Sequence, residues 1–455
     1  MTAIQTCVPA VAPLRLKLFY GVGQVGAQIF RDTPAVLLPL FMTTLLGVPA
    51  WMAGLAVLLP KLWVIFCDPL VGGWSDRLQP RRGRGGFLAT GAVLAALGFM
   101  ALFLVTRYPS PFLAAVAVCL LFLLASTGFS AFSVPYLALA AELSADPHER
   151  TRILLYRMTF AIAGVLLGVG LAQPVVFHFG GGAHGWHVMA VLFGGVCLVS
   201  MLATALAFWR FRSPRPATPP LTLAGQLRVA LANRPFRLLT LVHFIQSLGQ
   251  ASSYSVIGLV YLYAVRNIAI LPVFVLGMSA AGLLSQPYWL RSSRRHGKLR
   301  MFVVASGLWS LITITWIFVG LAGDSRLPGG MRVEDALVLL RGVLLGVVNS
   351  GFTLLAISML TDTISHGQRN NDRSVEGGLA GIWSAAEKLA FAAGPALGGV
   401  LLSLSGYVSS THGPVAQSPQ AILGILALYS LVPAGFCLGS LLLLRGYRQS
   451  FGEPA

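Results

Sequence analysis

The sequence predicts an all-α integral membrane protein with twelve transmembrane helices arranged as two halves of six. The chain has 455 residues, of which 56% are hydrophobic and only 10% are charged. Soluble domains carry about 25% charged residues, so this composition cannot cover a water-exposed surface. Long apolar runs, with basic residues grouped between them, support the same prediction.

Twelve apolar runs are long enough to cross a bilayer, which needs about 20 residues. Several are longer than this, so tilted helices or protruding ends are expected. Their approximate limits are 18–46, 51–75, 87–106, 112–140, 153–176, 187–209, 236–264, 268–290, 299–322, 335–361, 378–405 and 419–444.

A hydrophilic stretch divides these runs into two sets of six. Its segment RSPRPATPP is expected to be extended, and LTLAGQLRVALA is expected to form a short amphipathic helix on the membrane surface. Each set carries a basic cluster after its second run, at 75–86 and 291–300. We therefore expect an N-terminal half at 1–209, a cytoplasmic linker at 210–235 and a C-terminal half at 236–455.

The formal net charge of +18 comes from short basic clusters between the apolar runs. This placement is typical of membrane topology signals and argues against a nucleic-acid partner. If the N-terminus is cytoplasmic, the connections on the opposite side hold only Arg107, Arg266, Arg326 and Arg332. The pattern predicts a multi-pass protein of the plasma (inner) membrane with both termini in the cytoplasm.

Nothing in the sequence indicates an enzyme. It contains no Walker loop, no GxSxG motif and no cluster of His, Cys and carboxylate residues with catalytic spacing. Its five cysteines have no metal-ligand spacing and are expected to be small buried hydrophobes rather than a disulfide framework. We expect neither a metal nor a cofactor.

Five stretches resemble one transporter family. DPLVGGWSDRLQPRRGRGG is similar to the connection between helices 2 and 3 in the major facilitator superfamily, in the form found in melibiose permease-like glycoside–pentoside–hexuronide:cation symporters. Four further stretches resemble the same family in the same order: KLFYGVGQVG, VPYLALAAELSADPHERTRILLYR, ALANRPFRLL and SMLTDTISHGQRNNDRSVEGGLAGIWSAAEKLAFAAGPALGGVLL. The resemblance implies a major facilitator fold and secondary active transport by alternating access.

The resemblance carries over some of the family's functional residues. The second acid of helix 2 matches Asp68, but Val64 stands where the family has the first acid. The helix 11 lysine matches Lys388, and the helix 4 serines Ser130 and Ser133 could supply oxygens for a cation. With one acid missing, we expect H⁺ rather than Na⁺ as the coupling ion, although Na⁺ is not excluded. The alternative is a structural ion pair of Asp68 with Lys388 or Lys61.

A substrate site is expected on helices 1, 5 and 11. Gln28 replaces the family's sugar-binding acid, and Asp32 lies one turn beyond it on the same face. The helix 5 arginine matches Arg157, whose planar fork suits carboxylates or vicinal hydroxyls. Trp383 could stack on a ring-shaped solute. Each of these residues could instead serve packing or a local ion pair.

Two further polar residues lie within apolar runs, His243 and Glu387. We interpret His243 as a satisfied polar packing residue rather than a proton relay. Glu387 is about 100° from Lys388 around a helix, so it is expected to pair elsewhere.

Charged residues at the predicted cytoplasmic helix ends are candidates for a network that closes the inward gate. Topology requires Arg and Lys but does not require the acids interspersed with them. The candidates are Asp76, Arg77, Arg84, Glu142, Arg150, Asp362, Arg373 and Glu376.

The function expected from the resemblance is proton-coupled symport of a small polar solute, such as a glycoside or a sugar acid, by a monomer in the lipid bilayer. One alternative is a carrier of an amphipathic substrate such as a lysolipid. Another, of a different class, is a membrane receptor or assembly factor that does not transport. Retention of Asp68, Arg157 and Lys388 weighs against the last alternative.

Overall fold

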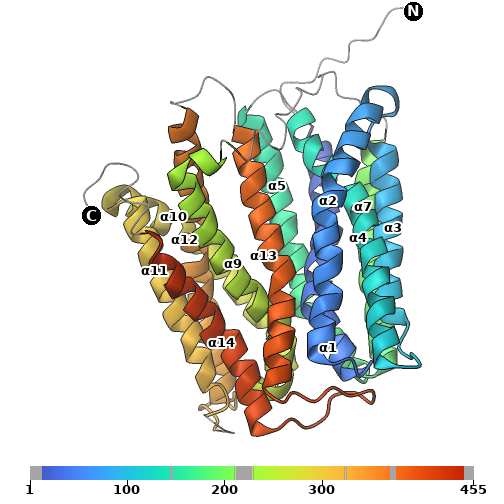
Figure 1. The fold of residues 1–455 in the computed structure, drawn as a ribbon, viewed down its shortest axis with the longest axis vertical. Helices are drawn as coiled ribbons and strands as arrows, with labels where there is room; N and C mark the ends of the chain where they lie inside the picture. The colour runs from blue at the N-terminus through green and yellow to red at the C-terminus, as the bar shows by residue number, and fades with distance from the viewer. Residues whose placement is uncertain are drawn as a thin grey trace, which may run out of the picture. The chain divides into compact units, whose positions relative to one another are not determined.

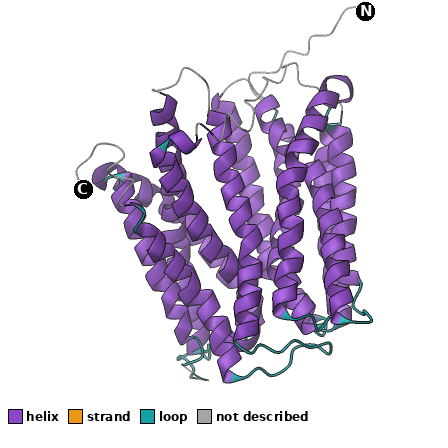
Figure 2. Ribbon diagram, in the orientation of Figure 1, coloured by secondary structure: helices purple, strands orange, loops and turns teal. Residues whose placement is uncertain are grey.

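A computed structural model describes residues 13–143, 147–209, 211, 228, 230–321, 323, 325–368 and 376–444. These residues are almost entirely helical, which confirms the all-α prediction (Figures 1 and 2). The chain divides into two compact units. The first comprises Met1–Thr218 with Ser409–Val415, and the second comprises Pro219–Val408 with Ala416–Ala455.

In the first unit, each expected apolar run corresponds to a long helix or to a stack of helical segments. The fifth crossing is the stack, because a π-helical segment interrupts it. The elements are α1 (Leu14–Thr44), α2 (Ala50–Arg82), α3 (Gly85–Leu104), α4 (Pro111–Glu142), α5 (Pro147–Val165), the π-helix η1 (Leu166–Leu171), α6 (Ala172–His178) and α7 (Ala183–Ala207).

The second unit repeats this arrangement. Its first crossing ends in a π-helical turn, and its third ends in a 3₁₀ turn. The elements are α9 (Arg234–Leu259), η2 (Val260–Val265), η3 (Ile268–Ile270), α10 (Leu271–His296), α11 (Lys298–Ile314), η4 (Thr315–Phe318), α12 (Val333–Gln368), α13 (Glu376–Leu404) and α14 (Pro419–Leu441).

Local sequence signals set several helix starts. Ser110, Asn233 and Ser418 each accept a backbone N–H from the first turn of the helix that follows, at 3.1–3.2 Å. Each is also followed by a proline in the first turn. Such caps satisfy the free N–H groups of a helix start, and proline there loses no hydrogen bond.

Ten helical segments among the described residues are long and apolar enough to cross a membrane. The remaining two expected crossings are α1 and α9, both of which carry polar side chains along their length. α1 contains Gln24, Gln28 and Asp32, and α9 contains His243 and Gln246. Polar residues inside membrane helices usually mark functional positions, so α1 and α9 are the helices most expected to carry a functional site.

The connection before α14 belongs partly to the first unit. Ser410 donates its backbone N–H to the Thr43 carbonyl at 2.8 Å, and Gly47 donates its N–H to the Ser410 carbonyl at 2.9 Å. These bonds attach residues 409–415 to the end of α1.

Candidate functional site

A ladder of side-chain hydrogen bonds runs along one face of α1. The Gln24 amide donates to Gln28 Oε1 at 3.0 Å, and the Gln28 amide donates to Asp32 Oδ2 at 2.6 Å. The spacing of four residues puts all three side chains in one row, over about 12 Å of helix. The structure thus brings together the two α1 residues expected at the substrate site, Gln28 and Asp32, and adds Gln24 to them.

Arg157 of α5 extends the ladder across to a second helix. Its Nε donates to Gln24 Oε1 at 2.8 Å, and its guanidinium carbon lies 5.6 Å from the centre of the Tyr136 ring. Within the described part of the chain, Arg157 forms no ion pair with an acid. Its partners include an amide oxygen and an aromatic face, and no carboxylate of the described residues neutralises its positive charge.

Two stacked tyrosines support Arg157. Tyr136 of α4 and Tyr20 of α1 stack with ring centres 4.6 Å apart and ring planes 21° apart. The Tyr136 hydroxyl donates to the Tyr20 backbone carbonyl at 2.6 Å. Because both rings are buried, they hold the face on which the guanidinium rests in one orientation.

The contact between α1 and α5 depends on glycine. A Cβ placed on Gly164 would lie 2.5 Å from Gln28 Cβ and 2.9 Å from the Val25 carbonyl oxygen. One turn further, Thr33 Oγ1 donates to the Gly168 carbonyl in the π-helical segment at 3.0 Å. The absence of a side chain at Gly164 is therefore what lets Gln28 lie between the two helices.

The other end of the ladder is also charged. Asp32 Oδ1 accepts from Arg31 Nε at 2.9 Å, and the Asp32 side chain is 15% exposed. Lys61 of α2 is close enough to interact electrostatically with Asp32 and Arg31. The ladder therefore joins a guanidinium at one end to a carboxylate with cationic neighbours at the other. Hydrogen bonds in such a chain polarise one another.

The predicted cation residues of the first unit lie at the contact between α2 and α4. The indole of Trp63 donates to Thr127 Oγ1 at 2.9 Å across this contact. One turn along, the Cys67 thiol interacts with both Ser130 and its chain neighbour Asp68. Asp68 is half-buried and Ser130 is fully buried. The structure thus places Cys67, the chain neighbour of Asp68 on α2, against Ser130 of α4, with Ser133 one turn further along α4.

In the second unit, His243 of α9 covers one face of the Trp383 ring of α13. The two rings stack with centres 3.9 Å apart and planes 9° apart. His243 Nε2 lies 3.9 Å from Glu387 Oε2. Neither imidazole nitrogen has a hydrogen-bond partner among the described residues, so His243 is not satisfied by hydrogen bonds, whereas its stacking on Trp383 agrees with the predicted packing role. Lys388 follows Glu387 on α13 and is exposed within the unit.

Sequence reasoning missed a buried ion pair at the helix ends predicted to be cytoplasmic. Lys17 Nζ lies 2.5 Å from Glu149 Oε1, and their side chains are 10% and 2% exposed. Arg152 lies 3.7 Å from the other Glu149 oxygen. Both stretches that contain this pair, KLFYGVGQVG and the one with PHERTR, carry the family resemblance, so that resemblance could have identified it.

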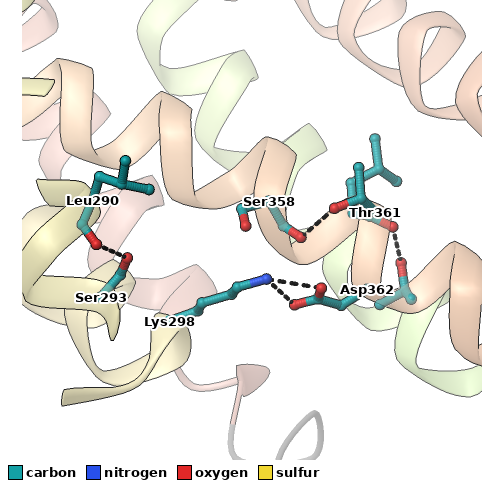
Figure 3. Close-up of polar contacts among 8 residues, drawn as sticks. Leu290, Ser293, Lys298, Ser358, Thr361 and Asp362 are labelled. Carbon is teal, nitrogen blue, oxygen red and sulfur yellow. Dashed lines mark hydrogen bonds and ion pairs between the residues drawn. The ribbon is translucent and has the colours of Figure 1, made fainter. Parts of the chain in front are cut away.

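Two of the predicted gate residues have defined partners. Arg84 is buried, and it donates from Nη1 to Ser75 Oγ at 2.8 Å. Asp362 of α12 accepts two hydrogen bonds from Lys298 Nζ of α11, at 2.6 and 2.8 Å (Figure 3). Arg77 is exposed. Arg373 lies outside the described residues, as do the side chains of Asp76, Glu142, Arg150 and Glu376. The gate role of these residues stays a prediction.

Comparison with known proteins decides the family. Residues 19–449 match the family model described as MFS/sugar transport protein. The chain belongs to this family, in the glycoside–pentoside–hexuronide:cation symporter branch of the major facilitator superfamily. It is 23% identical over 441 residues to the isoprimeverose transporter of Lactiplantibacillus pentosus, covering 95% of this chain and 88% of that protein.

A second relative and a solved structure agree with this assignment. The chain is 26% identical over 457 residues to the inner membrane symporter YicJ of Escherichia coli (strain K12), covering 96% of this chain and 92% of that protein. The crystal structure of a variant of the nucleoside transporter NupG matches with a TM-score of 0.64 at 13% identity. That match covers 96% of this chain and 100% of that one. It confirms the major facilitator fold.

Membership of this family confirms several predictions made from the sequence. The protein is a multi-pass membrane transporter and not an enzyme. It is a symporter of sugar-like solutes with cation coupling.

Proposed function

We propose that this protein is a proton-coupled symporter of a small polar solute, such as a glycoside or a sugar acid. Its two halves would expose the site to each side of the plasma (inner) membrane in turn. Gln28, Asp32 and Arg157 would bind the solute, and Asp68 would carry the proton. Lys388 would also take part in cation coupling, and both termini would lie in the cytoplasm.

The observation that carries this proposal is the environment of Arg157. A structural arginine inside a membrane normally pairs with an acid, because an unpaired charge there costs several kcal/mol. Arg157 instead rests on Gln24 and on the Tyr136 ring, with no acid partner among the described residues. A guanidinium held in this way keeps donors for a carboxylate or for vicinal hydroxyl groups.

The ladder also suits recognition of a polar solute. Gln24 and Gln28 are nearly fully buried, and each uses its amide within the ladder. A hydroxyl or carboxylate that joined this row would find donors and acceptors already oriented. The protein would then lose little side-chain entropy when the solute binds.

The choice of a proton over sodium rests on Asp68. A sodium site prefers several oxygens, of which more than one is anionic, and Val64 replaces the acid one turn before Asp68. A half-buried carboxylate beside the buried Cys67 can instead gain and lose a proton as its surroundings change. Protonation would then favour one of two conformations, as any ligand with unequal affinities does.

A binding experiment tests this proposal directly. Purified protein is titrated with sugars, glycosides, sugar acids and lysolipids at about pH 6 and about pH 8, with and without Na⁺, while the melting temperature is followed. We expect a sugar or sugar acid to raise the melting temperature without Na⁺, and the shift to depend on pH. Arg157→Ala should remove the shift, and Arg107→Ala, at an exposed arginine in the connection after α3, should keep it.

Each other result changes a different part of the proposal. A shift with lysolipids alone would replace the solute class with an amphipathic one. A shift that requires Na⁺ would assign sodium to Asp68 despite Val64. If no compound shifts the melting temperature and none is taken up by vesicles, a receptor without transport activity becomes the better hypothesis.

A further inference from the structure

Several polar side chains on one face of α9 have buried atoms that lack a hydrogen-bond partner among the described residues. Thr240, His243 and Gln246 follow one another at intervals of three residues, so their side chains share one broad face of the helix. Thr240 Oγ1, both His243 nitrogens and Gln246 Oε1 are buried without a hydrogen-bond partner among the described residues. Buried polar atoms are rarely left in this state unless they have a role that packing does not explain.

His243 is the centre of this face. Its ring is held flat against Trp383, at a centre-to-centre distance of 3.9 Å and an angle of 9°. Its Nε2 lies 3.9 Å from Glu387 Oε2, which is within ion-pair distance but too long for a hydrogen bond. The histidine side chain is 14% exposed, and the glutamate side chain is 49% exposed. The acid therefore reaches solvent-accessible space while the base is sheltered.

Glu387 is the acid within ion-pair distance of His243 among the described residues. The helical segments packed against α9 carry other charged or titratable groups. Asp362 is paired with Lys298, Glu334 with Arg341, and Asp335 accepts from Asn267. The full described set is Glu387 and Lys388 on α13, Tyr429 and Cys437 on α14, Glu334, Asp335, Arg341 and Asp362 on α12, and Tyr261 and Tyr263 on η2.

We propose that His243 and Glu387, with Trp383 as the stacking face, form a proton-binding site within the C-terminal unit. Imidazole is the side chain that ordinarily changes charge between about pH 5 and pH 8. A proton taken up by the ring would create an imidazolium between an anionic carboxylate and an indole face, and both contacts favour the cation. This site lies on α9 and α13 and does not involve Asp68.

Protonation would also change how α9 and α13 are held together. The neutral ring is held to α13 by stacking alone, since its nitrogens make no hydrogen bond to the described residues. The protonated ring would donate toward Glu387 and shorten the 3.9 Å separation to an ordinary charge-assisted hydrogen bond. The packing of these two helices would then depend on pH, even in a protein that lacks Asp68.

Tryptophan fluorescence of the full-length protein in detergent tests this inference without a substrate. An imidazolium in contact with an indole quenches its emission more strongly than a neutral imidazole does. We expect the wild-type emission to change in one step between about pH 5 and pH 8. His243→Gln and Trp383→Phe should each remove that step. Glu387→Gln should keep the step but move its midpoint to lower pH, with about tenfold weaker proton binding.

A control variant tests whether a histidine outside this site causes the change in emission. His296→Gln, at an exposed histidine at the end of α10, should leave the step and its midpoint unchanged. The proposal is overturned if the wild type shows no step, if the step survives in His243→Gln or Trp383→Phe, or if Glu387→Gln leaves the midpoint in place. If His243→Gln fails to fold, as judged by size-exclusion chromatography, Trp383→Phe and Glu387→Gln decide between these results. Asp68→Asn should keep the step, which distinguishes this inference from the proposed role of Asp68.

Discussion

Arg157 Nε lies 2.8 Å from Gln24 Oε1, and this hydrogen bond ties the arginine of α5 to the polar row of α1. This bond orients the guanidinium group. No carboxylate among the described residues pairs with Arg157. Gln24 is the hydrogen-bond partner of both Arg157 and Gln28, because its amide group also donates to Gln28. A substitution at Gln24 should therefore alter side-chain positions on both α1 and α5.

Gln24→Leu should disrupt the row while preserving the size of the side chain. Gln28 Oε1 and Arg157 Nε would both lose a buried partner, at a cost of about 1–3 kcal/mol in the free energy of unfolding. We also expect solute affinity to fall, because the guanidinium is no longer oriented. The melting temperature and the solute Kd report these effects. Gln420→Leu, at an exposed position in the first turn of α14, is the matched control, and equal losses in both variants would contradict the prediction.

Gly164→Ala should displace Gln28. The added Cβ would lie 2.5 Å from Gln28 Cβ, with backbone of α1 directly behind it, so one of the helices must move. Overpacking of this kind costs about 1–3 kcal/mol. We expect transport in vesicles to fall more than the melting temperature indicates. Gly73→Ala on α2 has open space at the same test position and should retain transport. A Gly164→Ala protein with normal uptake would argue against a role for Gln28.

Asp68→Asn should abolish solute accumulation driven by a proton gradient but preserve solute exchange across the membrane. The neutral side chain can no longer cycle between a charged and a protonated form, so a proton gradient cannot drive solute uptake. Exchange of labelled for unlabelled solute at equal concentrations should continue, because it requires no net proton movement. Uptake driven by a pH gradient and equilibrium exchange are measured in the same vesicles. Normal accumulation by Asp68→Asn would assign the coupling proton to another residue.

Lys17→Met and Lys298→Met should differ in their effect on stability. Lys17 pairs with Glu149 where both side chains are almost completely buried, so its loss leaves a buried charge and should cost about 3–5 kcal/mol. Arg152, 3.7 Å from Glu149, offsets part of this cost. Lys298 and Asp362 are 40% and 47% exposed, so that pair should contribute at most about 1 kcal/mol. Melting temperatures of the two variants would be compared, and equal values would show that burial does not decide the difference.

If Lys298 and Asp362 act as part of a gate, their substitution should change transport rate rather than stability. Lys298→Met would then alter the uptake rate while leaving the melting temperature nearly unchanged. Exchanging the two residues, as Lys298→Asp with Asp362→Lys, should restore the rate, because the pair joins α11 and α12 in either order. Failure of the exchanged variant to recover would indicate a requirement for one of the two charges at its own position.

The sequence by itself determined the class of the protein and the limits of its crossings. Apolar runs of sufficient length report directly on a bilayer, because no water is present there to satisfy an exposed backbone. The expected run at 419–444 corresponds to α14 (Pro419–Leu441), and the run at 87–106 to α3 (Gly85–Leu104). Family resemblance also led to Asp68, Arg157 and Lys388, since their neighbouring motifs are local in the chain.

Only the tertiary structure decided which polar groups meet. From the sequence alone, Trp383 could either stack on a ring-shaped solute or serve packing, and its contact in the structure is His243, which is 140 residues away in the chain. The sequence alone does not pair Glu149 with Lys17, although Glu149 is the buried partner of Lys17. Hydrophobicity and motifs are properties of short segments. Ion pairs and ring contacts between distant helices depend instead on how those helices pack, and a single sequence does not carry that information locally.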